Sequence, residues 1–126
     1  MAPFRTLMVV TAICATGLFP FAATAAEQLV VVVRTFATEG RESELQARSL
    51  KQIEFLRKAE PTATFRLFRS SKTPTTFLWL EVYETQAAYD NHLNVVLPNF
   101  RKEVGPAPQR LMAKPPEQEL FTEFAN

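Results

Sequence analysis

Cysteine, glycine and histidine are scarce in this sequence of 126 residues, and each scarcity excludes a class of chemistry. The only cysteine, Cys14, lies in an apolar leader, so the rest of the chain has no thiol for a disulfide, a nucleophile or a zinc cluster. Two isolated glycines follow the leader, Gly40 and Gly105, and they form no glycine-rich phosphate loop. With a single histidine, His92, the chain lacks the ligands of a structural zinc site, and we expect no metal or other cofactor.

The chain also lacks an excess of charge of either sign. Arg5 is the only charged residue of the leader, so the remaining chain carries thirteen basic and thirteen acidic residues. Balanced charge gives no electrostatic footprint for nucleic acid or for an anionic membrane surface. We therefore expect neither of them as a partner.

The first 26 residues have the pattern of a cleaved export signal. Arg5 supplies a positive start, residues 7–21 are apolar, and Ala23-Thr24-Ala25 offers small residues to a signal peptidase. The apolar segment of about 15 residues is too short to span a bilayer, which needs ~20. A retained N-terminal anchor is the alternative. With cleavage, residues 27–126 form one domain of ordinary size, located in the periplasm or outside the cell.

Hydrophobic periodicity predicts an alternation of strands and amphipathic helices in residues 27–126. The strands are expected at residues 29–37, 63–70, 76–84 and 119–125, and the helices at 41–59 and 85–97. Pro61 ends the first helix, Thr85 is a suitable N-cap for the second, and Pro98 begins a short helical continuation. The resulting βαββαβ order is that of the α+β ferredoxin-like fold, an antiparallel sheet with helices on one face.

The first and third predicted strands, LVVVV and FLWLEVY, are apolar on both faces. A sheet covered by helices on one face only should alternate apolar and polar residues. The chain has no spare segment for the second face, and exposed apolar patches of this size mark interfaces. We therefore predict a homodimer in which two sheets pack face to face and close a barrel. The alternative is a sheet whose second apolar face stays partly exposed.

His92 belongs to the apolar stripe of the second predicted helix, together with Tyr89 and Val96. Burial there disfavours the charged imidazolium and favours the neutral, proton-accepting form near pH 7. A general base needs that form. The alternative is a packed histidine that hydrogen-bonds a backbone carbonyl.

Glu81 is the one carboxylate in an apolar strand, and a buried charge needs a partner. Alternation gives this strand an aromatic set that includes the carboxylate, namely Phe77, Trp79, Glu81 and Tyr83, and an aliphatic set, namely Leu78, Leu80 and Val82. We expect the aliphatic set to pack against the helices and the aromatic set to face the second sheet. A structural ion pair of Glu81 with Arg34 or Arg66 then compensates its charge. With the faces reversed, Glu81 and His92 would meet.

The spacing E-x-Y-x-T-x-x-A-Y-x-x-H, from Glu81 to His92, resembles the hallmark of antibiotic biosynthesis monooxygenase (ABM) domains. In that family a strand ending in E-x-W or E-x-Y precedes a helix that carries a histidine. Glu60-Pro61 and the later Arg69-Ser70 resemble the E-P-G and R-S stretches of the same family. The resemblance covers roughly residues 28–125. Two departures are Thr62 in place of the family's glycine, and Leu97-Pro98 where many members have a second histidine.

The resemblance implies a dimeric α/β barrel with a small apolar pocket between sheet and helices. The best-understood members oxygenate quinols, anthrones or related phenols without metal or flavin, because a deprotonated phenol can reduce dioxygen directly. By this resemblance His92 is the candidate catalytic base. The candidate substrate-binding residues are Tyr83, Tyr89, Trp79, Phe36 and Arg34. Two alternatives are a non-catalytic dimer that binds a small ligand in the cell envelope and an isomerase that uses the same base.

Overall fold

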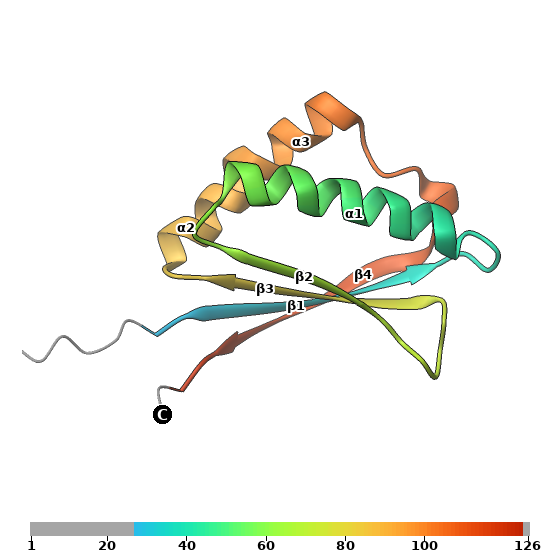
Figure 1. Ribbon diagram of the computed structural model, residues 1–126, viewed down its shortest axis with the longest axis horizontal. Helices are drawn as coiled ribbons and strands as arrows, with labels where there is room; N and C mark the ends of the chain where they lie inside the picture. The colour runs from blue at the N-terminus through green and yellow to red at the C-terminus, as the bar shows by residue number, and fades with distance from the viewer. Residues whose placement is uncertain (1–26, 125–126) are drawn as a thin grey trace, which may run out of the picture.

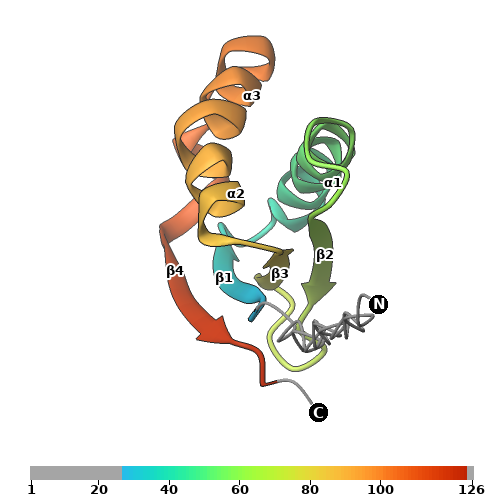
Figure 2. The same cartoon turned by 90° about the vertical axis from the view of Figure 1, so that its left-hand side faces the viewer.

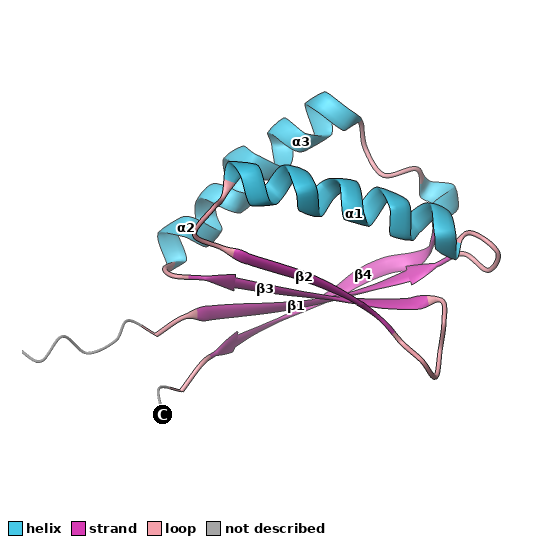
Figure 3. Cartoon of the chain, in the orientation of Figure 1, coloured by secondary structure: helices cyan, strands magenta, loops and turns pink. Residues whose placement is uncertain are grey.

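In the computed structural model, which describes residues 27–124, one antiparallel sheet carries all the helices on one of its faces (Figures 1 and 3). The elements are β1 (Leu29–Ala37), α1 (Glu42–Ala59), β2 (Thr64–Arg69), β3 (Thr76–Tyr83), α2 (Gln86–Asn91), the π-helix η1 (His92–Val96), α3 (Leu97–Val104), the short 3₁₀ helix η2 (Gln109–Leu111) and β4 (Met112–Thr122). The strand order is β2-β3-β1-β4, and every neighbouring pair is antiparallel. The predicted ferredoxin-like fold is confirmed. The predicted export signal, with Cys14, lies outside the described residues.

Helix α1 forms where the sequence predicted it, because its apolar stripe repeats with the period of a helix. The buried residues of α1 are Leu45, Ser49, Ile53 and Leu56. The helix ends at Glu60, whose backbone N–H bonds to the carbonyl of Leu56, just before Pro61. In Figure 2, α1 lies over the β2 side of the sheet, and α2 with α3 lies over the β1 and β4 side. None of the described helices is both long and apolar enough to cross a membrane.

The second helical segment begins at the predicted cap, where the Thr85 hydroxyl accepts a hydrogen bond from the N–H of Ala88 at 3.1 Å. It does not continue as a regular α-helix, because a π turn runs through His92–Val96 and the N–H of Leu97 bonds to the carbonyl of His92. Pro98 explains the irregularity, since proline has no N–H and its ring clashes with the carbonyl four residues earlier. The first residue of this π turn is His92.

The last strand differs from the prediction. It begins at Met112 rather than at residue 119, and it includes Pro115 and Pro116. Proline interrupts a central strand, but β4 lies at the edge of the sheet and pairs only with β1. The register of the β1–β4 pairing also shifts near Phe36, as at a β-bulge. This shift accommodates the irregular backbone around the two prolines.

The face assignment of β3 was wrong. The aromatic set points toward the helices and is buried, whereas the aliphatic set lies on the opposite face and is half-buried. A strand has the same period of two in either orientation, so alternation alone cannot tell which face meets the helices. The reversal brings Glu81 under the helical layer, where His92 also lies.

We call the sheet face away from the helices the outer face. Residues paired across antiparallel strands share a face, so the pairs Val30–Val82 and Val32–Leu80 both lie on it. Its apolar members are Val30, Val32, Phe36, Phe68, Leu78, Leu80, Val82 and Phe121, and its charged members are Arg34, Arg66, Lys114, Glu117 and Glu119. No described element covers this face (Figure 2), and the sheet of a single chain is not closed into a barrel.

Packing of α1 on the sheet predicts that alanine substitutions at two leucines of this helix have very different effects on the free energy of unfolding. Leu56 is fully buried, so Leu56→Ala is expected to lower the free energy of unfolding by about 2–5 kcal/mol. Leu50 is half exposed, so Leu50→Ala should change it by no more than about 0.5 kcal/mol. Urea unfolding followed by circular dichroism measures both. Equal effects of the two substitutions would contradict this orientation of α1.

Candidate functional site

A cavity of about 280 Å³ lies between the sheet and the helical layer. This volume is near the lower end of small-molecule sites, which are about 300–1,000 Å³. The side chains of its wall that matter below are Thr35, Trp79, Glu81, Tyr89, His92 and Gln118. They come from β1, β3, α2, η1 and β4, so the cavity exists only in the assembled fold.

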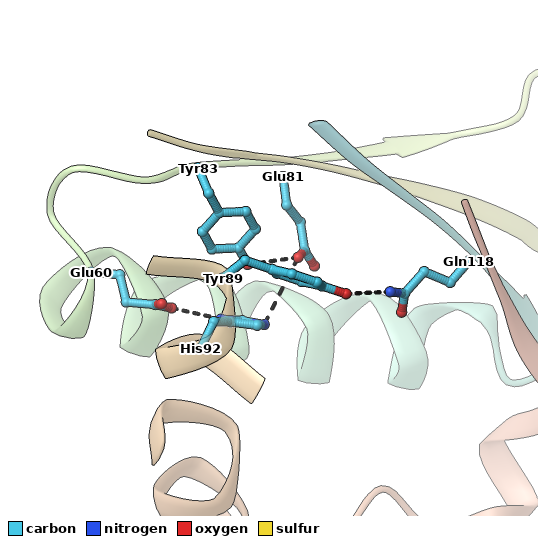
Figure 4. Close-up of polar contacts among 6 residues, drawn as sticks. All are labelled: Glu60, Glu81, Tyr83, Tyr89, His92 and Gln118. Carbon is cyan, nitrogen blue, oxygen red and sulfur yellow. Dashed lines mark hydrogen bonds and ion pairs between the residues drawn. The ribbon is translucent and has the colours of Figure 1, made fainter. Parts of the chain in front are cut away.

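His92 is held in one orientation by Glu60. Its Nδ1 atom lies 2.7 Å from Oε2 of Glu60, and both side chains are buried (Figure 4). A carboxylate oxygen can only accept a hydrogen bond, so Nδ1 donates its proton to Glu60. The lone pair of the neutral ring is then on Nε2. Glu60 therefore selects the tautomer in which Nε2 is the proton acceptor.

Glu81 lies on the other side of the imidazole. Its Oε2 atom is 3.8 Å from Nε2 of His92 and accepts a 2.7 Å hydrogen bond from the hydroxyl of Tyr83 (Figure 4). The separation of 3.8 Å is too long for a hydrogen bond. A ligand oxygen beside both atoms can, however, lie about 2.8 Å from each of them. The gap between Nε2 and Glu81 is therefore suited to a hydroxyl group.

Burial shifts the protonation of the groups around this gap. It raises the pKa of Glu81 above its usual range, and the Tyr83 hydrogen bond and the nearby His92 only partly oppose it. Burial, followed by the charge of Glu81, also raises the pKa of Tyr83, so this tyrosine is a permanent hydrogen-bond donor. Glu81 is thus a carboxyl group that can hold a proton at a pH where an exposed glutamate does not.

Aromatic rings enclose the imidazole. The ring of Tyr89 is nearly parallel to that of His92, at 13° with centroids 6.3 Å apart, and the ring of Phe65 is inclined by 29° with centroids 5.9 Å apart. The Tyr89 hydroxyl accepts a short hydrogen bond from the amide of Gln118, which leaves its own proton to donate (Figure 4). Burial raises the pKa of Tyr89 and keeps that proton in place. Aromatic rings therefore cover the imidazole, and Tyr89 keeps a phenolic proton to donate beside it.

Within residues 27–124, no group of three or more His, Cys, Asp or Glu side chains is arranged to hold a metal ion. The geometry gives the reason. Glu60 and Glu81 approach opposite nitrogens of the His92 ring, so the three side chains do not converge on one point.

The predicted site residues divide between the two faces of the sheet. His92, Tyr89 and Trp79 line the cavity, and Tyr83 lies behind it as the hydrogen-bond partner of Glu81. Arg34 and Phe36, the other two candidates, belong to the outer face and do not contribute to the cavity wall.

The predicted ion pair of Glu81 with Arg34 or Arg66 is not formed, because both arginines project from the opposite face of the sheet. Glu81 is compensated by Tyr83 and His92 instead. Glu81 was interpreted as a structural residue because it was assigned to the sheet face away from the helices. It lies instead on the inner face, in the wall of the cavity.

Glu60 is the residue of the candidate site that the residue-by-residue reasoning missed. A glutamate at the end of an amphipathic helix has the sequence signature of a solvated side chain, and its contact with His92 joins positions 32 apart. The available signal was its position just before Pro61 in the stretch that resembles E-P-G. Gln118 gave no signal, because β4 was expected to begin after it.

The family model described as antibiotic biosynthesis monooxygenase (ABM) matches residues 28–101. The chain has no match among the curated proteins at the threshold applied. Solved structures resemble it closely enough to show a shared fold. A protein of Caulobacter crescentus, named provisionally as an antibiotic biosynthesis monooxygenase, has a TM-score of 0.69 at 20% identity, over 80% of this chain and 93% of that chain.

Two further structures agree with this fold. Protein SO0527 of Shewanella oneidensis has a TM-score of 0.63 at 22% identity, over 78% of this chain and 92% of that chain. Rv0793 of Mycobacterium tuberculosis has a TM-score of 0.61 at 20% identity, over 79% of this chain and 97% of that chain. The family match spans more than half of the sequence and includes Glu60, Glu81 and His92. The chain belongs to the antibiotic biosynthesis monooxygenase family.

Proposed function

We propose that this protein is an exported, cofactor-independent monooxygenase that oxidises small aromatic quinols or phenols with dioxygen, and that His92 is its base. Membership of the ABM family supports the reaction class. The observation that carries the proposal is the 2.7 Å contact of Nδ1 with Glu60, which leaves Nε2 of a buried histidine as a proton acceptor at the cavity wall.

In the proposed reaction, a phenolic hydroxyl lies in the gap between Nε2 of His92 and Glu81, and its proton moves to Nε2. The resulting phenolate is electron-rich and transfers electrons to dioxygen directly, so the substrate itself is the reductant. One oxygen atom forms a bond to a ring carbon, and the other leaves as water. A quinol and one dioxygen thus give a hydroxylated quinone and one water, and no further reductant is needed. The cavity supplies orientation.

Glu60 has a defined part in this step. Proton transfer to Nε2 turns the imidazole into a buried cation, which is costly without a nearby anion. The Glu60 carboxylate is already in contact with the opposite nitrogen, so its charge stabilises that cation. We therefore assign Glu60 as the residue that positions and stabilises the base.

The proposal includes a homodimer formed through the outer face. Eight apolar side chains lie on this face, and a second copy can bury them by packing the same surface against itself. Arg66 on the β2 edge strand and Glu119 on the β4 edge strand have opposite charges, which suits a two-fold arrangement. The export signal predicted for residues 1–26 places the domain in the periplasm or outside the cell.

Oxygen uptake with a panel of quinols under air tests the role of His92. We expect His92→Ala to lower kcat by about 10²–10⁴-fold, because it removes the base. Glu60→Gln should lower kcat by at least about 10-fold, because it removes the charge that stabilises the imidazolium. The matched control is Glu54→Gln, an exposed glutamate of α1, which should leave kcat unchanged.

Undiminished oxygen uptake by a folded His92→Ala protein would overturn the assignment of the base. Ligand binding without oxygen uptake by the wild type would indicate a non-catalytic binding protein instead. Conversion of a carbonyl substrate at the same rate with and without oxygen would indicate an isomerase.

Because burial raises the pKa of Glu81, we expect Glu81→Gln to increase the free energy of unfolding by an amount that depends on pH. In the folded protein Glu81 binds its proton more tightly than in the unfolded chain, where the pKa is about 4.3. Stability from this proton is fully present below that value and is lost as the pH rises through the raised pKa. Glutamine is neutral throughout, so Glu81→Gln should be more stable than the wild type at about pH 8, by on the order of 1 kcal/mol.

This gain should shrink as the pH falls to about 4, where wild-type Glu81 is protonated. Urea unfolding at several pH values measures the difference, and Glu84→Gln, at an exposed neighbouring position, is the control. A stability difference that does not depend on pH would show that the environment of Glu81 does not favour its protonated form.

Sedimentation or light scattering of the purified protein tests the dimer. Leu80 lies on the outer face, paired with Val32 and Arg66, so Leu80→Arg should convert the dimer into a monomer. Leu50→Arg, at an exposed position of α1, should leave the dimer intact. A wild type that is monomeric at micromolar concentration would refute the proposed assembly.

A further inference from the structure

The cavity extends along the sheet, well beyond the gap at Glu81. Glu81 is paired with Val31 of β1, and Thr35, which also lines the cavity, follows four residues later on that strand. At a rise of about 3.3 Å per residue, the wall therefore continues for about 13 Å along the sheet. Leu45 of α1 lines the cavity too, and it packs in a core cluster with Phe77, the residue paired with Thr35. We call the region around Thr35 and Leu45 the far end of the cavity.

Two arginines contribute to the wall at the far end. Arg48 comes from α1 and Arg101 from α3, the two helices that lie side by side above the sheet in Figure 2. Arg48 follows Leu45 by about one helical turn. Its guanidinium carbon lies 5.7 Å from the centre of the Phe100 ring, and Arg101 is the next residue after Phe100. The two arginines therefore belong to the same part of the wall.

Arg48 is held in place by contacts that leave donors unused. Its Nη2 atom donates a 2.6 Å hydrogen bond to the carbonyl oxygen of Gly105, and its guanidinium lies over the Phe100 ring. Gly105 ends α3 with a φ of 88°, a conformation that glycine adopts without strain, so the fold fixes this acceptor. A guanidinium has more N–H donors than one such bond uses. Arg48 is therefore a half-buried cation with a fixed position and free donors.

Neither arginine has an anionic partner in the part of the chain that the structure describes. The ion pairs within residues 27–124 involve other basic side chains. Glu81 is the only acidic side chain among the described residues of the cavity wall, and it lies at the opposite end. Charged groups that are removed from water are normally paired. The far end thus has an excess of positive charge, although the charges of residues 27–126 balance.

The shape of the guanidinium restricts which group can complete this region. Its parallel N–H donors match the two oxygens of a carboxylate or a phosphate, and the charges attract. A neutral hydroxyl or carbonyl oxygen can accept one of the hydrogen bonds but leaves both positive charges without a counter-charge. Gln52, one turn after Arg48, adds a neutral polar side chain to the same stretch of wall. The far end is therefore suited to an oxyanion.

We propose that Arg48 and Arg101 form a subsite for an anionic group of the ligand, at the end of the cavity away from His92. The placement of the ligand's phenolic oxygen at His92 rests on the proposed function. The subsite narrows the substrate class to phenols or quinols that carry a carboxylate or phosphate, and disfavours neutral quinols. His92 and Arg101 are nine residues apart along η1 and α3, roughly 13 Å at the rise of a helix, so the acid belongs on a side chain of the ring.

Calorimetric titration with two ligands of nearly equal shape tests this subsite. 3-(4-Hydroxyphenyl)propanoate is an anion at neutral pH, and 3-(4-hydroxyphenyl)propanamide is its neutral counterpart. We expect the wild type to bind the propanoate more tightly than the amide. Arg48→Gln should lower the affinity for the propanoate by about 10-fold, and Arg101→Gln, at a more exposed position, by about 3-fold. The amide should bind both variants within about 2-fold of the wild type.

Lys51→Gln is the matched control, because it removes one positive charge from α1 outside the cavity wall and should leave the ratio of the two affinities unchanged. A third ligand, 2-(4-hydroxyphenyl)ethyl phosphate, identifies the anion, since the tighter of the two anions shows which group the arginines fit. Arg101 forms no side-chain hydrogen bond within residues 27–124, so Arg101→Gln is expected to fold even if Arg48→Gln does not.

Tighter or equal binding of the amide by the wild type would overturn the subsite, as would failure to bind either anion. A preference for the anions that persists undiminished in both arginine variants would also overturn it. A structural role of Arg48 alone, as the hydrogen-bond donor to Gly105, would lower stability without changing the ratio of affinities. Because the titration needs no turnover, a charge preference without oxygen uptake would refute the monooxygenase activity and leave the subsite standing.

Discussion

His92 lies between two carboxyl groups, and all three side chains are more than nine-tenths buried. Two ionised carboxylates in a low-dielectric interior would be costly, so this arrangement favours a proton on Glu81. The raised pKa of Glu81 agrees with this requirement. In the proposed reaction, His92 acts beside a carboxyl group that can itself hold a proton. The proposed chemistry therefore involves two proton-binding groups on either side of a gap of 3.8 Å.

Each group in this contact is fixed by a different part of the fold. Glu60 follows the last buried turn of α1, Glu81 belongs to the strand between β1 and β2, and His92 begins the π turn that precedes Pro98. The surrounding core cluster includes Leu56, Phe65, Tyr83, Tyr89 and Val96. These side chains leave the ionisable groups little freedom to separate and hydrate, which is the ordinary way for a buried charge to reduce its cost. A π turn that begins at the proposed base also fits the general tendency of such turns to occur at functional sites.

The fold could be predicted because the sequence features that determine its elements act between residues that are close together in the chain. The period of α1, the Thr85 cap and the turn residues each act within a few positions of the chain, and the structure confirms them. The site could be predicted only in part, because its contacts are not local. His92 was recognised from the inner stripe of its own helix, but Glu60 meets it across 32 positions, and no periodicity reports such a contact. The face of β3 was assigned wrongly for the same reason, since alternation defines two faces without saying which one the helices cover.

The reversal of β3 also explains how one sheet can carry a cavity on one face and the proposed dimer interface on the other. On β3 the aromatic side chains lie on the inner face, where Trp79 lines the cavity, and the aliphatic side chains Leu78, Leu80 and Val82 lie on the outer face. β1 and β3 supply both, because successive residues of each strand alternate between the two faces. In the proposed dimer, packing on the outer face would therefore fix the backbone that positions Glu81 and Trp79 on the inner face. The partner copy would support the site although none of its residues is needed to complete the contacts of His92.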